Sequence, residues 1–361
     1  MQLITPAYKG APKQEGDASS YRPIAITSYL SRTWERVVAL RLENTLARLC
    51  PAQFGYLRGR TADQMTGATR RTIERILGTT PNEGGAHHVA AAISFDCTDA
   101  FCKVTPAMVR KGLIRIGVDA NTTEVITEWM TDRRQAVKLG GTVTAYELVE
   151  AGLPQGSVLG PFLWDVVFDD LNVLLYREAA RVLRDVPAGH MFCGSFADDL
   201  NMVVGGATPA AAARKLQDWA QQACVWFDTA GIPVSPKSKA SFFARTNRPP
   251  VPAVLKLFTG INPTREIAIT NEGLKILGVH FSNDGTCKKH LQLVQEHLAN
   301  LCITLGSIAM LAHPHKVRQI YQQQGMTKLR YVRPPPGKWR PHRMLWRRAT
   351  ITTRDPQSTS R

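Results

Sequence analysis

The aspartates of this sequence include two groups that could bind metal. Asp96 follows an apolar run from Ala86 to Phe95, and Asp198 and Asp199 are adjacent between two short apolar runs. Adjacent carboxylates repel each other unless a cation lies beside them. Oxygen ligands suit Mg²⁺, and two such ions can stabilise the attacking and leaving oxygens of a phosphoryl transfer. An isolated Asp-Asp pair is more often simple turn chemistry, so the surrounding motifs must decide between the two interpretations.

The strands that position these carboxylates are predicted from hydrophobic runs. The segment Ala86 to Phe95 is typical of a strand that leads into Asp96. His190 to Phe196 and Leu200 to Val204 are predicted to form a β-hairpin with residues 197–199 at its tip. The two groups of aspartates are therefore both expected at strand ends.

Three helices are predicted around these strands. One carries an apolar stripe at every fourth residue, made of Leu30, Trp34, Val38, Leu42 and Leu46. A second, Phe162 to Leu175, follows the turn at Gly160-Pro161. A third is capped by Thr208, starts at Pro209 and ends at Gly231, with a predicted buried face of Leu216, Trp219, Ala223, Trp226 and Phe227. Because strands and helices mix irregularly, the expected fold class is α+β.

Composition restricts the class of protein. The 361 residues are 44% hydrophobic, so the chain can bury a large core, and a net charge of +16 favours a polyanionic partner such as nucleic acid. The sequence has no run of about 18 apolar residues and no signal-peptide pattern, so a soluble protein that is not secreted is expected, without a membrane partner. Seven scattered cysteines without a C-x-x-C pair indicate reduced thiols in an intracellular compartment.

Six motifs in order give the sequence a family resemblance. Ser195 to Leu200, with Phe-Ala-Asp-Asp inside it, resembles the aspartate box of the reverse transcriptases of LINE-type (non-LTR) retrotransposons. The other blocks occur in the order and at the spacing of that family, and they are Ser20 to Ile24, Gln53 to Tyr56 with Arg58 to Arg60, Phe95 to Phe101, Gly152 to Pro161, and Leu274 to Val279. The resemblance covers about residues 1–295, and an ingi-like origin is a guess within it.

The resemblance implies a right-hand polymerase with fingers, a palm built on an antiparallel sheet, and a partial thumb. Asp96 matches the first metal-binding carboxylate of the family and Asp198 the second, while Asp199 completes the box. The implied cofactor is a pair of Mg²⁺ ions, with Mn²⁺ as the alternative ion. The implied partners are an RNA template, a DNA primer and deoxynucleoside triphosphates.

Nucleotide-binding residues are carried over in the same way. Arg22 matches an arginine that grips the triphosphate, a role in which Lys9 could assist. Phe101 matches an aromatic residue that would exclude a 2′-hydroxyl, although a core phenylalanine is the alternative. Gln155 and Gly156 belong to a block that contacts template and nucleotide, where glycine lets the backbone approach a base or sugar; an ordinary loop is the alternative.

The lysine near the leaving pyrophosphate is harder to assign. Counting back from Phe243 favours Lys237, whereas counting forward from Gly231 places Ser238 where the family has lysine. Lys239 is a third candidate, and lysines on a solvated surface are an equal alternative.

Other polar clusters are expected to be structural. Asp165, Asp169 and Asp170 are interpreted as a solvated helix face or a helix-edge network. A zinc site is disfavoured, because helical spacing and the lack of a close cysteine pair point to core or surface residues; the four candidate ligands are Cys287, His290, His297 and Cys302.

The predicted domains are fingers and palm over 1–272, a partial thumb over 273–325, and a poorly ordered basic tail over 326–361. Because no endonuclease or RNase H is recognisable, the sequence is interpreted as a truncated copy. A catalytically inactive remnant that still binds nucleic acid is therefore the alternative function, and a nuclear location is inferred from where such elements insert their DNA.

Overall fold

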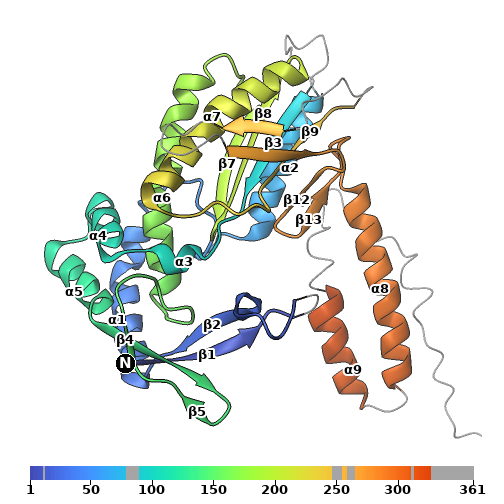
Figure 1. The fold of residues 1–361 in the computed structure, drawn as a ribbon. Helices are drawn as coiled ribbons and strands as arrows, with labels where there is room; N and C mark the ends of the chain where they lie inside the picture. The colour runs from blue at the N-terminus through green and yellow to red at the C-terminus, as the bar shows by residue number, and fades with distance from the viewer. Residues whose placement is uncertain (11–12, 79–88, 246–253, 258–264, 310–312, 327–361) are drawn as a thin grey trace, which may run out of the picture. The chain divides into compact units, whose positions relative to one another are not determined.

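The computed structural model describes the chain except residues 11–12, 79–88, 246–253, 258–264, 310–312 and 327–361 (Figure 1). Its contacts divide the chain into two units, Met1–His290 and Leu291–Arg361. In its described residues the first unit contains two larger sheets, a two-stranded sheet and most of the helices, and it carries all the predicted catalytic and nucleotide-binding residues. The predicted tail begins at Met326 and otherwise lies outside the described residues.

The larger sheet of the first unit has six strands in the order β10-β11-β9-β3-β8-β7. Its central strands are antiparallel: β3 pairs with β8 on one side and with β9 on the other, and β7 pairs with β8. The exception is the parallel pair β9 and β11. The strands are β3 (Val89–Phe95), β7 (Met191–Phe196), β8 (Asp199–Gly206), β9 (Lys239–Phe243), β10 (Val254–Leu257) and β11 (Arg265–Thr270).

Strand β3 is buried on both faces, as its nearly continuous apolar sequence indicates. Ala91, Ile93 and Phe95 point into the main core, whereas Ala90 and Ala92 point into a second core on the opposite face. This alternation follows from the two-residue period of a strand. The prediction of a strand leading into Asp96 is confirmed over Val89–Phe95; residues 86–88 of the predicted strand lie outside the described residues.

Helices cover both faces of this sheet (Figure 1). Helices α6 (Gly160–Val182) and α7 (Pro209–Ala230) pack together on the face of the main core. Helix α2 (Ala62–Gly78) lies on the other face, where the β12–β13 hairpin (Leu274–Ile276 and Val279–Phe281) completes the second core. The hairpin therefore packs against the sheet, although it falls in the segment that the sequence assigned to a thumb.

Helix α7 is specified by local sequence signals, and its prediction is confirmed. The Thr208 hydroxyl accepts a hydrogen bond from the Ala211 amide at 3.1 Å, and Gly231 ends the helix with a φ of +65°. Such a left-handed residue is most easily a glycine.

Helix α1 (Tyr29–Leu46) is also confirmed, with one correction to its apolar stripe. Val38 and Leu42 are buried in the main core, against which Trp34 and Leu46 pack. Leu30 is 80% exposed, so its prediction as part of the core-facing stripe was wrong. It lies in the first turn of the helix, before the helix reaches the core.

A second sheet contains the N-terminal strands in the order β2-β1-β4-β5, with β6 also paired to β4. These strands are β1 (Gln2–Tyr8), β2 (Tyr21–Ile26), β4 (Arg133–Leu139), β5 (Thr142–Val143) and β6 (Glu147–Val149). The remaining short elements of the first unit are η1 (Ala18–Ser20), α3 (Ala100–Lys103), α4 (Pro106–Arg115) and α5 (Ala120–Met130). Mixed sheets and helices in this irregular order confirm the α+β class.

The second unit is helical in its described part. Helix α8 (Lys288–Ala309) starts just before the division, and α9 (Pro314–Ile320) and the π-helical turn η3 (Tyr321–Met326) follow. Within the described residues, no helix has both the length and the apolar character needed to span a membrane.

Candidate active site

The three predicted catalytic aspartates lie together at one end of the larger sheet. Asp96 directly follows β3, and Phe95 pairs with Leu200 across the antiparallel ladder, so the next residues along, Asp96 and Asp199, face each other. Phe196 pairs with Asp199, which leaves Ala197 and Asp198 as a two-residue turn between β7 and β8. The predicted hairpin is therefore confirmed.

The turn has a strained backbone. Ala197 has a φ of +55°, a conformation that is uncommon for any residue with a side chain. Its carbonyl accepts a hydrogen bond from the Trp164 indole at 2.8 Å. Strain of this kind persists only where surrounding contacts hold it in place, and it is frequent at functional sites.

Asp96 is held from the opposite side by the loop that follows α7. The Ser235 amide donates to the Asp96 carbonyl at 2.7 Å, and the Asp96 amide donates to the Ser238 hydroxyl at 3.1 Å. Ser238 is buried. Counting forward from Gly231 placed Ser238 where the family has a lysine. In the structure, the hydroxyl of this serine instead fixes the backbone of Asp96.

Burial and mutual repulsion perturb these carboxyl groups. Burial, with the charges of Asp198 and Asp96 as smaller causes, raises the pKa of Asp199 to about 7. Burial and the charge of Asp96 likewise raise the pKa of Asp198. The neighbouring Cys97 thiol has a raised pKa through burial and through the charges of all three aspartates. Like charges held this close are unfavourable without a cation.

The residues present fit a hard divalent cation, because all three candidate ligands are carboxylates. In the described part of the chain, no three or more His, Cys, Asp or Glu side chains, these aspartates included, form a group that could hold a metal ion by itself. The four candidate zinc ligands form no such group there either. Mg²⁺ keeps several waters and takes ligands from substrate phosphates, so it requires fewer protein groups than an enclosed site.

A pocket of about 730 Å³ opens beside these aspartates. Asp96 and Asp199 line it, together with Lys237 and Lys239, both of which are exposed. The pocket places two lysine side chains near the carboxylates and does not single out Lys237 from Lys239. Its remaining lining residues are Ser94, Thr270, Glu272, Gly273, Leu274, Lys275 and His280.

Phe101 lies in the short helix α3 and is linked to the turn through Trp164. The two rings are stacked with centroids 5.3 Å apart and an interplanar angle of 15°. Because Trp164 also hydrogen-bonds the Ala197 carbonyl, one side chain contacts both the predicted sugar-selecting residue and the aspartate turn.

The remaining predicted nucleotide-binding residues lie on or against strand β2, outside the lining of the aspartate pocket. Arg22 is exposed on β2, and Lys9 donates to the Ser19 carbonyl at 2.7 Å. The Gln155 carbonyl accepts a hydrogen bond from the Ala25 amide at 2.6 Å.

Gly156 has a structural role that the sequence did not predict. It has a φ of +112°, and a Cβ there would lie 2.8 Å from the Ala25 carbonyl oxygen. The group that it must approach within this chain is therefore strand β2, whereas the sequence suggested a base or sugar.

The sequence also missed a segment that packs against the hairpin of Asp198 and Asp199. The Phe54 amide donates to the Ser195 carbonyl at 2.8 Å, and the Ser195 amide donates to the Ala52 carbonyl at 2.9 Å. A Cβ on Gly55 would lie 2.4 Å from the Ala197 nitrogen, so this position admits only glycine without rearrangement. The block from Gln53 to Tyr56 was recognised as a motif, but its contact with the aspartate turn depends on tertiary structure.

Tyr56 ends this segment in an unusual conformation. It has a φ of +53° and is 52% exposed. Burial and the charges of Asp198 and Asp165 raise the pKa of its hydroxyl.

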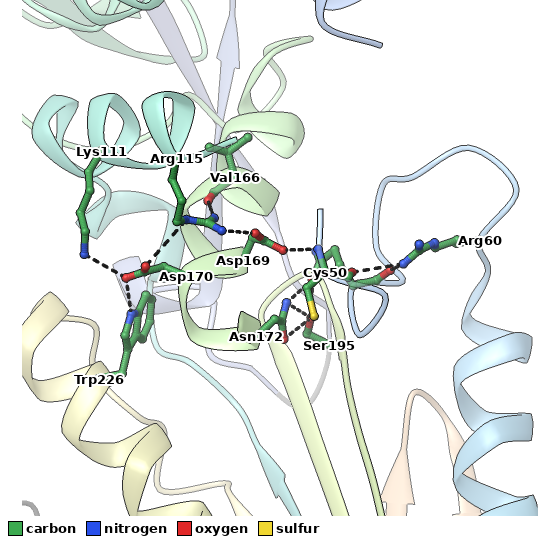
Figure 2. Close-up of polar contacts among 11 residues, drawn as sticks. Cys50, Arg60, Lys111, Arg115, Val166, Asp169, Asp170, Asn172, Ser195 and Trp226 are labelled. Carbon is green, nitrogen blue, oxygen red and sulfur yellow. Dashed lines mark hydrogen bonds and ion pairs between the residues drawn. The ribbon is translucent and has the colours of Figure 1, made fainter. Parts of the chain in front are cut away.

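Two of the three aspartates on α6 are corrected. Asp165 and Asp169 are fully buried, so the interpretation as a solvated face was wrong for them. Figure 2 shows the Asp169 carboxylate between Arg115, at 2.5 Å, and the Cys50 amide, at 2.6 Å. Asp170 is 30% exposed and pairs with Lys111 at 3.1 Å. The alternative of a helix-edge network describes all three better, because α6 carries apolar residues around its whole circumference and is buried accordingly.

The burial of Asp165 predicts that the free energy of unfolding depends on pH. Burial, with the charge of Asp169 as a smaller cause, raises the pKa of Asp165 to about 8. Its Oδ1 accepts a hydrogen bond from the Gln53 amide, whereas its Oδ2 has no hydrogen-bond partner among the described residues. The group therefore resembles a neutral acid, for which asparagine is a close substitute.

The Asp165→Asn variant is expected to be more stable than the wild type at pH 8, by about 2 to 4 kcal/mol. In the wild type, the folded state binds a proton that the unfolded chain, with a pKa near 3.8, releases. The contribution of protonated Asp165 to the free energy of unfolding is complete below about pH 3.8 and is lost as the pH rises to about 8. Urea denaturation from pH 4 to 9 should show the two free energies of unfolding diverging with pH; parallel curves would contradict the prediction.

The antiparallel sheet with a strained Asp-Asp turn opposite a third aspartate is the palm of a right-hand polymerase. The family described as "Reverse transcriptase (RNA-dependent DNA polymerase)" matches residues 11–281. The chain belongs to the reverse transcriptase family, in its LINE-type (non-LTR) branch, which confirms the resemblance seen in the motifs. An ingi-like origin stays a prediction.

Individual relatives agree with this assignment. The probable RNA-directed DNA polymerase from transposon BS of Drosophila melanogaster is 27% identical over 254 residues, which are 68% of this chain and 26% of that protein. The Pol polyprotein from type-1 retrotransposable element R2 of Popillia japonica is 33% identical over 156 residues, 42% of this chain and 20% of that protein. The matched part of this chain thus spans about a fifth to a quarter of the length of these relatives.

Among solved structures, apo telomerase from Candida tropicalis, truncated from its C-terminal domain, aligns with a TM-score of 0.46 and 13% identity. The alignment covers 69% of this chain and 52% of that chain.

Proposed function

We propose that this chain is an RNA-directed DNA polymerase that extends a DNA primer on an RNA template. The observation that carries the proposal is the convergence of Asp96, Asp198 and Asp199, half-buried carboxylates whose mutual repulsion a cation would relieve, beside a pocket lined by two lysines. The net charge of +16 supports a polyanionic substrate.

In this proposal, Asp96 and Asp198 hold the metal, and Asp199 completes the carboxylate group. Two bound Mg²⁺ ions, or Mn²⁺ in their place, would activate the primer 3′-hydroxyl and stabilise the leaving pyrophosphate. Lys237 or Lys239 would supply positive charge or a proton to the pyrophosphate, because both line the pocket. Arg22 would bind the triphosphate, and Gln155 and Gly156 would form part of the surface that contacts template and nucleotide.

The domain assignment is also part of the proposal. Fingers and palm would occupy 1–272, a partial thumb 273–325 and a basic tail the remainder. The enzyme would act in the nucleus, because elements of this kind insert their DNA there.

Primer extension on a poly(rA)/oligo(dT) duplex with purified protein and Mg²⁺ tests the proposed activity. Incorporation of dTMP that depends on both the duplex and the metal is the expected result. If the protein binds the duplex and never extends it, the polymerase proposal fails for this chain, and the inactive nucleic-acid-binding remnant takes its place.

Phe101 is proposed to exclude ribonucleotides, and this role gives a separate prediction. The Phe101→Val variant removes the ring that stacks on Trp164 and that is proposed to exclude a 2′-hydroxyl. We therefore expect discrimination between dTTP and UTP to fall by about tenfold or more. The measurement is the ratio of kcat/KM for the two nucleotides, with Tyr176→Val, an exposed aromatic on α6, as the control. An unchanged ratio in a folded Phe101→Val protein would assign Phe101 to the core instead.

A further inference from the structure

A buried polar cluster holds the strand that leads into the catalytic turn. Ser195 lies on β7, three residues before Asp198. Its hydroxyl faces Gln53 and Asn172, and Gln53 in turn contacts Asp165. All four side chains of this cluster are completely buried, and they come from β7, from α6 and from the segment after α1.

The hydrogen bonds of the cluster form a consistent chain of donors and acceptors. The Asn172 side-chain amide donates to the Ser195 hydroxyl at 2.8 Å and to the Gln53 side-chain Oε1 at 3.0 Å. The Ser195 hydroxyl donates to the same Gln53 Oε1, and the Gln53 side-chain Nε2 donates to Asp165. Figure 2 shows Asn172 directed at Ser195, on the same helix as Asp169, which holds the Cys50 amide.

Further bonds fix the backbone of the same segment against β7. The two main-chain bonds between Ser195 and residues 52–54 add a short parallel bridge at the edge of the sheet. Arg60 donates to the carbonyls of Pro51, at 3.0 Å, and of Gln53. The segment is thus held from both sides, and it places Gly55 against the Ala197 nitrogen.

Such a cluster specifies geometry more than it adds stability. Apolar side chains of similar volume often stabilise an interior as well as buried polar groups do. Hydrogen-bonded groups, however, allow one arrangement, because any displacement leaves a desolvated donor or acceptor without a partner. A shift of β7 by one residue would also turn every side chain of the strand to the opposite face.

We propose that Gln53, Asn172 and Ser195 are positioning residues for Asp198. They fix β7 against α6, so that the turn presents its carboxylate to Asp96 at a constant distance. The role in catalysis rests on the proposed polymerase activity, whereas the role in ordering the hairpin does not.

The test compares Ser195→Ala and Gln53→Met with Thr69→Val. Ser195→Ala removes the shared hydroxyl, and Gln53→Met keeps the side-chain volume, so the test does not depend on the folding of a single variant. Thr69 is equally buried, but its hydroxyl bonds only within α2, to the Met65 carbonyl at 3.0 Å. It therefore controls for the loss of a buried hydroxyl away from the hairpin.

Two readouts are measured on the full chain. We expect amide hydrogen exchange to quicken over residues 191–200 in both test variants and not over β9. We expect kcat for primer extension to fall by roughly 10- to 100-fold, with the KM for dTTP and the Kd for the primer–template within about twofold of the wild type. Thr69→Val should alter neither exchange in the hairpin nor kcat.

Unchanged exchange in the hairpin would overturn the proposal, as would faster exchange over the whole sheet together with an unchanged kcat. If the wild type itself extends no primer, the proposed polymerase activity fails. The exchange comparison then still decides whether the cluster orders the hairpin.

Discussion

Primer extension by the Asp198→Asn variant is expected to fall at least about a thousandfold, with the affinity for the primer–template retained. Asparagine keeps the shape of the side chain but carries no charge to hold a divalent ion. Asp198 lies in the two-residue turn next to Asp199, which faces Asp96 across the ladder, so the substitution removes one of the two carboxylates on the hairpin side of the site. The measurement is kcat for dTMP incorporation beside the Kd of the duplex.

A surface aspartate provides the matched control. Asp185 pairs with Lys215 at 2.7 Å and its side chain is 70% exposed, so Asp185→Asn should extend the primer at the wild-type rate. Mg²⁺ should also raise the melting temperature of the wild type, because a ligand that binds only the folded state stabilises it. That shift should disappear in Asp198→Asn. An Asp198→Asn protein that extends the primer at the wild-type rate would show that Asp198 holds no catalytic metal.

Much of the site was predictable because its signals are local in the sequence. The apolar runs on either side of the Asp-Asp pair determine a hairpin, and the run before Asp96 determines a strand that belongs in the middle of a sheet. Antiparallel pairing of these strands then brings the aspartates to the same end. Thr208 and Gly231 define α7 in the same local way, through a cap and a left-handed terminus.

The contacts that hold the site in place were not predictable, because they join segments far apart in sequence. Asp165 and Asp169 resemble surface residues until α6 is known to be surrounded by the sheet, α4 and the segment after α1. Ser238 occupies a position where the family motif has a lysine, and its role depends on the hydrogen bond that its hydroxyl accepts from the Asp96 amide. In each case a polar residue acquires its role from a partner more than 60 positions away or on another element.

Gly55 gives the second large expected effect. In Gly55→Ala, the new Cβ would lie 2.4 Å from the Ala197 nitrogen, 3.2 Å from the Phe196 carbonyl carbon and 3.3 Å from the Ala197 Cα. All three atoms belong to the backbone, so no side chain can rotate away to make room. Either the segment after α1 or the aspartate turn must move. Because catalytic groups displaced by about 1 Å can lose about 100-fold in rate, we expect a loss of that size in kcat.

The close contact in Gly55→Ala lies at the aspartate turn, so its effect on kcat can be distinguished from a general loss of stability. Overpacking alone should cost about 1 to 3 kcal/mol of the free energy of unfolding, which leaves a folded protein to assay. Gly141→Ala is the matched control, since Gly141 has no neighbour within 4 Å of a new Cβ and does not have a positive φ. A Gly55→Ala protein that melts below the wild type and still extends a primer at the wild-type rate would mean that the turn keeps its geometry and that the segment after α1 yields instead. A large loss of kcat with duplex binding intact would mean that the aspartate turn has moved, because Gly55 touches the chain at Ala197, one residue before the metal-binding Asp198 of the proposal.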